Sequence, residues 1–124
     1  MTAPTEVVKA FLAAMSRRDF AGMEALMAPG FRMTVTGGEV YTHPKDFAAA
    51  SGKRQKSARK TTDHYDEIAT PDGGIVYSIG SMAGEWNTGA AYAGIRYIDR
   101  FEIENGKIRD MQVFSDMAEF RPKP

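Results

Sequence analysis

The chain has 124 residues and no cysteine, and its sixteen basic and sixteen acidic side chains cancel. That length fits one domain, residues 1–124, with a buried core of its own. The lack of cysteine excludes disulfides, thiolate zinc sites and a cysteine nucleophile, and the zero net charge argues against nucleic acid or a membrane surface as a partner.

The N-terminal segment does not have the pattern of a signal peptide. Four charged residues interrupt its apolar positions, namely Glu6, Lys9, Arg17 and Arg18, whereas a secretion signal needs a basic start followed by an unbroken apolar stretch. No run approaches the roughly 18 apolar residues of a transmembrane helix. We therefore expect a cytoplasmic location.

Two helices are predicted near the N-terminus. The first begins around Pro4-Thr5 and has one apolar stripe at helical spacing, made of Val7, Val8, Phe11, Leu12 and Met15. Asp19 is a suitable cap for a second helix, whose apolar pattern runs to Met27 and which Pro29-Gly30 should end.

A strand over residues 31–36 should follow, closed by Gly37-Gly38, with residues 39–41 pairing back on it. His43-Pro44 opens a third helix, which Gly52 weakens or ends. The segment KRQKSARK after it is strongly basic and has little apolar periodicity. We interpret it as a solvated loop, with a phosphate or acidic ligand site as the alternative.

From Thr61 onward the apolar period changes from helical to two, and four strands are predicted: 61–69, 75–86, 91–104 and 107–120. Asn105-Gly106 is a tight hairpin signal that makes the last two strands antiparallel neighbours. Helices first and long strands afterwards are typical of an α+β fold. We expect three helices on one face of a curved antiparallel sheet, with a cavity at its open end.

Asp99 is the most unusual residue of the long hairpin. Alternation places it on one face with Ile95, Tyr97, Phe101 and Ile103, where it is the only ionisable carboxyl group. A carboxylate in apolar surroundings must be paired with a hydrogen-bond donor or a cation, be hydrated, or be protonated through a raised pKa. Asp99 is therefore either a catalytic acid or donor, or a structural aspartate with a nearby partner.

The other candidates have ordinary structural readings as well. His64 could face inward and pair with Asp99 as a base, or face outward as a plain strand residue. His43 fits a surface or capping position, and two unrelated histidines give weak support for a metal site. Trp86 could line the cavity mouth or a dimer interface. Tyr41, Tyr77 and Tyr97 could bind a ligand or pack in the sheet, as could the methionines.

The chain resembles the nuclear transport factor 2-like superfamily, in particular its SnoaL-like and ketosteroid-isomerase-like branch. The resemblance rests on the amphipathic first helix, RRDFAGMEALMAPGF, the HPKDF helix start and the hairpin YIDRFEIENGKIRDMQVF. It implies a cone-shaped, cystatin-like roll, a small apolar ligand between helices and sheet, and a homodimer formed through the sheet.

The catalytic sets of this branch are incomplete in the present sequence. Asp99 falls where ketosteroid isomerases keep a protonated aspartate. Phe11 stands in place of their first-helix tyrosine, and no carboxylate lies near Val35 and Thr36, where their general base would be. The final-strand aspartate of the epoxide hydrolases is replaced by Val113, and only His64 and Asp66 approach their arginine–aspartate pair.

Three hypotheses remain for the function. The first is a cofactor-free isomerase, cyclase, dehydratase or hydrolase acting on a small apolar oxygenated molecule, with Asp99 and His64 as catalytic residues. The second is a non-catalytic protein that binds a hydrophobic ligand, and the third is an interaction module. No cofactor or metal is expected, and the residues predicted to line the cavity are Phe11, Met15, Tyr41, Tyr77, Trp86, Tyr97, Phe101, Met111 and Val113.

Overall fold

The fold was analysed in a computed structural model, which describes residues 2–122. Helices α1 (Pro4–Ser16), α2 (Phe20–Glu24) and α3 (Pro44–Ser51) come from the first half of the chain, and the short α4 (Met117–Phe120) lies near its end. The strands are β1 (Met27–Thr34), β2 (Val40–Tyr41), β3 (Gln55–Thr70), β4 (Gly73–Trp86), β5 (Ala91–Glu104) and β6 (Lys107–Ser115).

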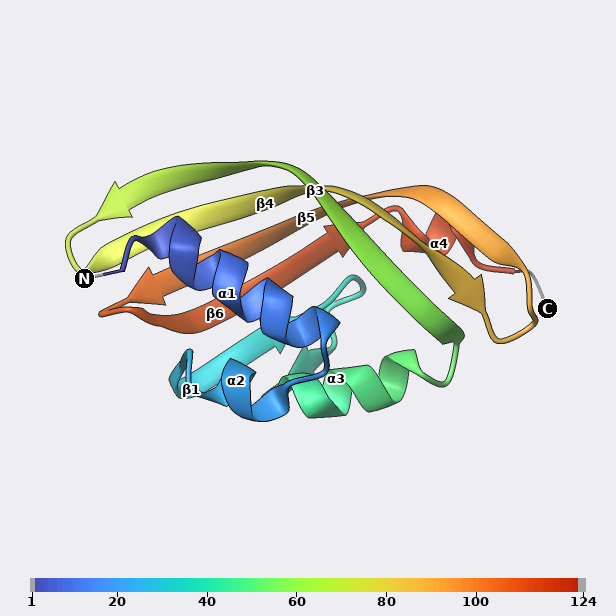
Figure 1. The fold of residues 1–124 in the computed structure, drawn as a ribbon, viewed down its shortest axis with the longest axis horizontal. Coiled ribbons are helices and arrows are strands. Elements are labelled where there is room, and N and C mark those ends of the chain that lie inside the picture. Colours follow the sequence, from blue (N-terminus) through green and yellow to red (C-terminus); the bar gives the residue numbers. More distant parts are fainter. Residues whose placement is uncertain (1, 123–124) are drawn as a thin grey trace.

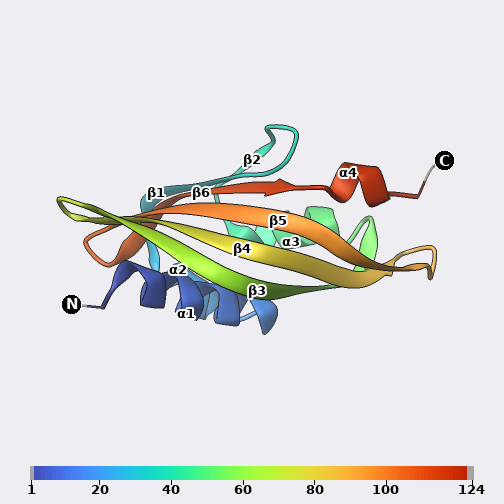
Figure 2. The same ribbon diagram turned by 90° about the horizontal axis from the view of Figure 1, so that it is seen from above.

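The strands form one curved sheet in the order β2-β1-β6-β5-β4-β3. Helices α1 and α2 lie along one face of this sheet, and β3 bends toward α3 at its start (Figures 1 and 2). All neighbouring pairs are antiparallel except β1 and β6, which run parallel. The predicted α+β class, with N-terminal helices on a curved and mostly antiparallel sheet, is therefore confirmed, and the parallel β1–β6 pair is the one addition to it.

The apolar stripe of α1 anchors the main core. Phe11 is fully buried and its ring lies 6.0 Å from that of Phe31 and 6.1 Å from that of Phe101. The core also includes Val7, Val8, Ala14, Met23, Met33, Val76, Ile103, Ile108 and Met111. A second buried cluster holds Trp86 against Tyr92, 4.6 Å apart, together with Met82, Ile95 and Tyr97.

Two predicted helix starts have the expected caps. The Asp19 carboxylate accepts a hydrogen bond from the Gly22 backbone amide. His43 caps α3 by accepting from the Lys45 amide through Nδ1, and its Nε2 lies 2.6 Å from the Glu24 carboxylate. Both caps satisfy amides that a helix start would otherwise leave without partners.

Several predicted boundaries were wrong. Pro29-Gly30 does not end a helix but lies inside β1, at a break in its pairing with β6, where a residue without an N–H is tolerated. The basic segment is not a loop, because β3 already begins at Gln55. Charged residues are common on such an edge strand. The last strand ends at Ser115, and α4 was not predicted.

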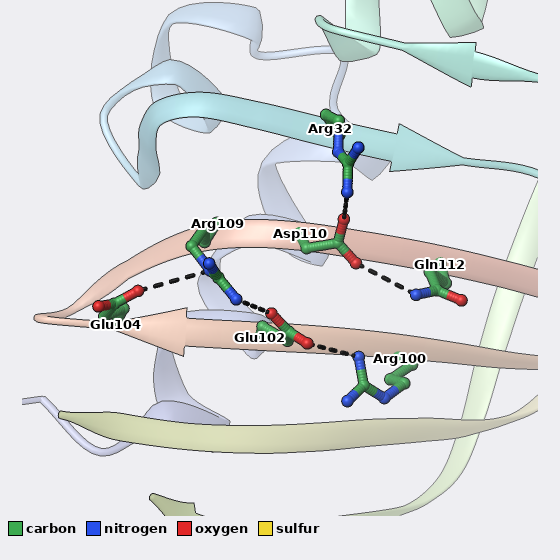
Figure 3. A network of polar contacts seen from close by, with 7 residues as sticks. All are labelled: Arg32, Arg100, Glu102, Glu104, Arg109, Asp110 and Gln112. Carbon is green, nitrogen blue, oxygen red and sulfur yellow. Dashed lines mark hydrogen bonds and ion pairs between the residues drawn. The ribbon is translucent and has the colours of Figure 1, made fainter. Parts of the chain in front are cut away.

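The outer face of the sheet carries a polar network instead of helices. The Glu102 carboxylate accepts from Arg100, 2.9 Å away, and also pairs with Arg109 (Figure 3). Beside it, Asp110 pairs with Arg32 at 3.6 Å. Within the described part of the chain, no helix is long and apolar enough to cross a membrane.

Gly80 lies at a close approach between the neighbouring strands β4 and β3. A Cβ atom on this residue would lie 2.0 Å from the Thr61 carbonyl oxygen and 2.9 Å from the Thr62 Cα. Both are main-chain atoms, so the overlap could be relieved only by moving β3 away from β4.

We therefore predict that Gly80→Ala lowers the free energy of unfolding by about 2 kcal/mol or more, measured by urea denaturation. Gly52→Ala is the control, because its Cβ would meet only ordinary contacts at 3.5 Å and its backbone is already helical. Equal stabilities of the two variants would contradict this account of Gly80.

Candidate functional site

A cavity of about 620 Å³ lies between the helices and the inner face of the sheet. Its apolar wall includes Leu12 and Met15 from α1, Phe47 from α3, Met82 from β4 and Val113 from β6. Polar side chains enter from β3, among them Lys60 and Thr62. The volume is that of a small-molecule site, and the mixture of apolar wall and few polar groups is typical of one.

Asp99 lies on the inner face, as its alternation with Tyr97 and Phe101 predicts, and it is completely buried. Its Oδ2 accepts a hydrogen bond from the Lys60 ammonium at 2.5 Å. Its Oδ1 has no hydrogen-bond partner among the described residues. The carboxylate thus depends on one counter-charge, supplied by a strand two positions away in the sheet.

Burial and Lys60 act on the Asp99 carboxyl in opposite directions. Burial raises the pKa of Asp99 above its ordinary value and is the larger effect, while the charge and hydrogen bond of Lys60 lower it. The net direction is upward. The site therefore holds a carboxyl group that is harder to ionise than an exposed aspartate, with an ammonium group beside it.

Lys60 is the member of this pair that reaches the cavity. Its side chain is 24% exposed and belongs to the cavity wall, whereas Asp99 lies behind it. The Lys60 Nζ also lies 4.7 Å from the centre of the Tyr97 ring, a distance at which the ring attracts a cation. Asp99 and Tyr97 together hold the ammonium group in place.

Thr62 supplies a second polar group to the cavity from the same strand. Its hydroxyl lies 2.8 Å from the Tyr97 hydroxyl, and the buried Ser78 hydroxyl lies 3.3 Å from that of Tyr97. Since Lys60 and Thr62 are two positions apart in a strand, both point to the same face. A ligand oxygen on this part of the wall would meet an ammonium group and a hydroxyl group.

The predicted pairing of His64 with Asp99 is not present. His64 pairs across the strands with Ile79, whose side chain is on the outer face, and its ring is 55% exposed, 3.6 Å from the Asp66 carboxylate. The reason is a bulge between Thr62 and His64. One extra residue in β3 reverses the alternation, so that Tyr65 faces inward.

The predicted cavity-lining residues divide into two groups. Met15, Tyr41 and Val113 line the cavity. Phe11, Phe101 and Met111 are fully buried in the main core, Trp86 packs on Tyr92, and Tyr97 lies behind Lys60. Tyr77 shares the outer side of β4 with Ile75 and Ile79. These six residues are not part of the cavity wall.

Sequence reasoning missed Lys60, Thr62 and Ser78. Lys60 was placed in a solvated loop, although its alternation with Ala58 and Thr62 was a usable sign of a strand. Ser78 was overlooked on a face otherwise occupied by Val76, Gly80 and Met82. Within residues 2–122, histidine and carboxylate side chains form no group of three that could hold a metal ion.

The buried pair should make stability depend on pH. Because the folded-state pKa of Asp99 is raised, the folded protein binds more protons than the unfolded chain above the ordinary value of 3.8. The free energy of unfolding must then fall as pH rises through that window. Removing Lys60 would raise the pKa of Asp99 further, because Lys60 lowers it. The loss of stability with rising pH would then continue to higher pH.

We predict that Lys60→Met costs about 3 kcal/mol near pH 8 and clearly less near pH 5, measured by urea denaturation. Asp99→Asn should remove this pH dependence in both backgrounds. Lys56→Met is the matched control, since Lys56 forms only an exposed pair with Glu85, worth about 0.5 kcal/mol. Parallel pH curves for the wild type and Lys60→Met would contradict the assignment.

Comparison with known proteins agrees with this architecture. An NTF2-like protein of unknown function from Burkholderia pseudomallei is 19% identical, with a TM-score of 0.81, over 97% of this chain and 95% of that one. TerC, co-crystallised with polyporic acid, is 18% identical, with a TM-score of 0.78, over 96% and 95%.

A candidate polyketide cyclase from Pseudomonas putida is 20% identical, with a TM-score of 0.74, over 98% of this chain and 97% of that one. These likenesses establish the fold, and a search of curated proteins gives no match. The family model of the SnoaL-like domain matches residues 8–111, which include most of the helices and strands around the cavity. The chain therefore belongs to the SnoaL-like family of the NTF2-like superfamily.

Proposed function

We propose that this protein is a cofactor-free enzyme whose cavity binds a small, mostly apolar, oxygenated molecule and acts on it by acid–base chemistry. The observation that carries the proposal is the Lys60 ammonium group, exposed to the cavity and held from behind by the buried Asp99. A candidate polyketide cyclase and a protein crystallised with polyporic acid share the fold, which supports an organic ligand of this kind.

The chemistry follows from the charge on Lys60. When a solvent molecule in the cavity takes the proton from the carbon next to a carbonyl group, the electron pair of the broken C–H bond moves toward the carbonyl oxygen, on which negative charge develops; protonation of the same carbon by solvent restores the ketone. A fixed ammonium group in a partly enclosed site stabilises that charge more than it stabilises the neutral carbonyl. Thr62 can donate a second hydrogen bond to the same oxygen. Lys60 is the catalytic residue here, and Asp99 is a positioning residue.

This assignment differs from the sequence-based hypothesis in two respects. That hypothesis made Asp99 the donor to the ligand and His64 its partner. Asp99 has a cation between itself and the cavity, and His64 is on the outer face. An inward His64 within reach of Asp99 is therefore absent, and the proposal depends on Lys60 instead, the titratable group that does lie beside Asp99.

The test uses 2-tetralone, a small apolar ketone, and follows deuterium exchange next to its carbonyl by NMR in D₂O. We expect the wild type to accelerate exchange, and the acceleration by Lys60→Met to be about 100-fold smaller. Asp99→Asn should also lose activity, while His64→Ala should keep it. Binding of the ketone without any exchange would favour the alternative, a non-catalytic ligand-binding protein.

We also propose a homodimer formed through the outer face of the sheet. Ile98 and Phe114 lie directly opposite each other on β5 and β6 and are 41% and 54% exposed. Two residues further along β5 lies Arg100, the first member of the Arg100–Glu102–Arg109 network (Figure 3). An apolar pair with a polar border is the usual composition of a protein–protein contact.

Sedimentation velocity over a concentration series tests the dimer. We expect Phe114→Asp to shift the protein to the mass of one chain, because a buried unpaired charge would oppose association. Ile68→Asp is the control: this isoleucine is 52% exposed on β3, at the edge of the sheet. A wild-type protein that stays monomeric at all concentrations would refute the proposal.

A further inference from the structure

The cavity wall is strongly basic, although the chain as a whole is neutral. Besides Lys60, six cationic side chains line it, and Glu39 is the only carboxylate among the described lining residues. The six are Lys9, Arg18, Arg54, Lys56, Arg59 and Arg121. If the charges of this neutral protein were distributed evenly over its surface, so many cations would not surround one cavity.

Most of this charge has no acidic partner in the described part of the chain. Lys9 pairs with Glu6 and Lys56 with Glu85, each at 3.4 Å. Within residues 2–122, no ion pair involves Arg18, Arg54, Arg59 or Arg121 at the cavity, although eleven ion pairs occur elsewhere or at its edge. The cavity thus has more positive charge than the acidic side chains of the described residues neutralise.

Arg54 and Arg121 are close enough to influence each other. Partial burial and the charge of Arg54 both lower the pKa of Arg121. Burial and Glu39 raise the pKa of the Tyr41 hydroxyl, and the charge of Arg54 acts in the opposite direction. Tyr41 also lines the cavity. Two like charges in proximity repel each other, so their approach costs free energy that a bound anion would recover.

The backbone holds Arg54 in this position. Its amide donates to the Ser51 carbonyl at 3.0 Å, and its own carbonyl accepts from the Asn87 amide at 2.9 Å. The Asn87 side chain in turn donates to the Gly52 carbonyl at 3.1 Å. The end of the β4–β5 hairpin therefore fixes the backbone of the segment that carries Arg54, a residue of the cavity wall.

We propose that the ligand of this cavity is an oxyacid: an apolar body with a carboxylate or phosphate group, held by Arg54 and Arg121. The arginines present planar, always charged groups of the kind that bind such oxyanions through two hydrogen bonds. The apolar body lies against Met15, Phe47 and Val113, and the oxygen to be activated lies at Lys60. This inference rests on the proposed function and specifies the class of its substrate.

The test compares two fluorescent probes with the same aromatic framework. 8-Anilinonaphthalene-1-sulfonate carries an anionic group, and N-phenyl-1-naphthylamine lacks it. We expect the double variant Arg54→Gln/Arg121→Gln to bind the sulfonate about tenfold more weakly, with the affinity for the neutral probe unchanged. Added salt should weaken the sulfonate complex of the wild type in the same selective way.

The control variant is Lys45→Gln/Lys53→Gln, which removes the same charge from α3 and the adjoining turn without touching the cavity wall. It should bind both probes as the wild type does. An equal loss of sulfonate affinity in the two double variants would overturn the inference, because net charge alone would then explain it. Failure of the wild type to bind either probe would refute the proposed function as well.

Competition then distinguishes the two kinds of headgroup. 2-Naphthoate and 2-naphthyl phosphate are added to displace the sulfonate probe, with 2-naphthol as the uncharged reference. Displacement by either anion at about tenfold lower concentration than the naphthol supports the inference and identifies the preferred headgroup. If the naphthol displaces the probe as well as both anions do, the cavity selects apolar surface only and the inference fails.

Discussion

A carboxylate with no exposed surface needs a compensating charge, and this requirement shapes the inner face of the sheet. Asp99 meets it through a single bond to Lys60. Leaving either partner alone would cost several kcal/mol, while the intact pair contributes little net stability. The pair is therefore better explained by what it offers the cavity, an ammonium group in a fixed position, than by a contribution to folding.

The Lys60–Asp99 pair spans three strands of the curved sheet. Lys60 and Asp99 belong to β3 and β5, which are separated by β4. On the inner face of β4, between the two, lie the small residues Ser78 and Gly80, and Ser78 is directly opposite Asp99. These small residues lie between the two partners in the sheet, and neither one lines the cavity.

The cavity wall carries further positive charge besides Lys60. Lys60 is neutralised from within, by Asp99, whereas Arg54 and Arg121 have no such partner among the described residues. Arg54 and Arg121 would therefore orient a ligand that has an anionic end and a carbonyl oxygen before its oxygen reaches Lys60. Binding at one end and activation at the other would fix the reacting atom in place.

The sequence by itself determined the order of the elements, the α+β class, the Asp19 and His43 caps, the Asn105-Gly106 hairpin and the inward direction of Asp99. All of these depend on local period and turn chemistry. The tertiary structure alone decided the parallel pairing of β1 with β6 and the bulge in β3. A bulge arises from how two strands pair, which no single segment encodes. For that reason His64 was a natural candidate in the sequence, and Lys60 became the partner of Asp99 only in the folded protein.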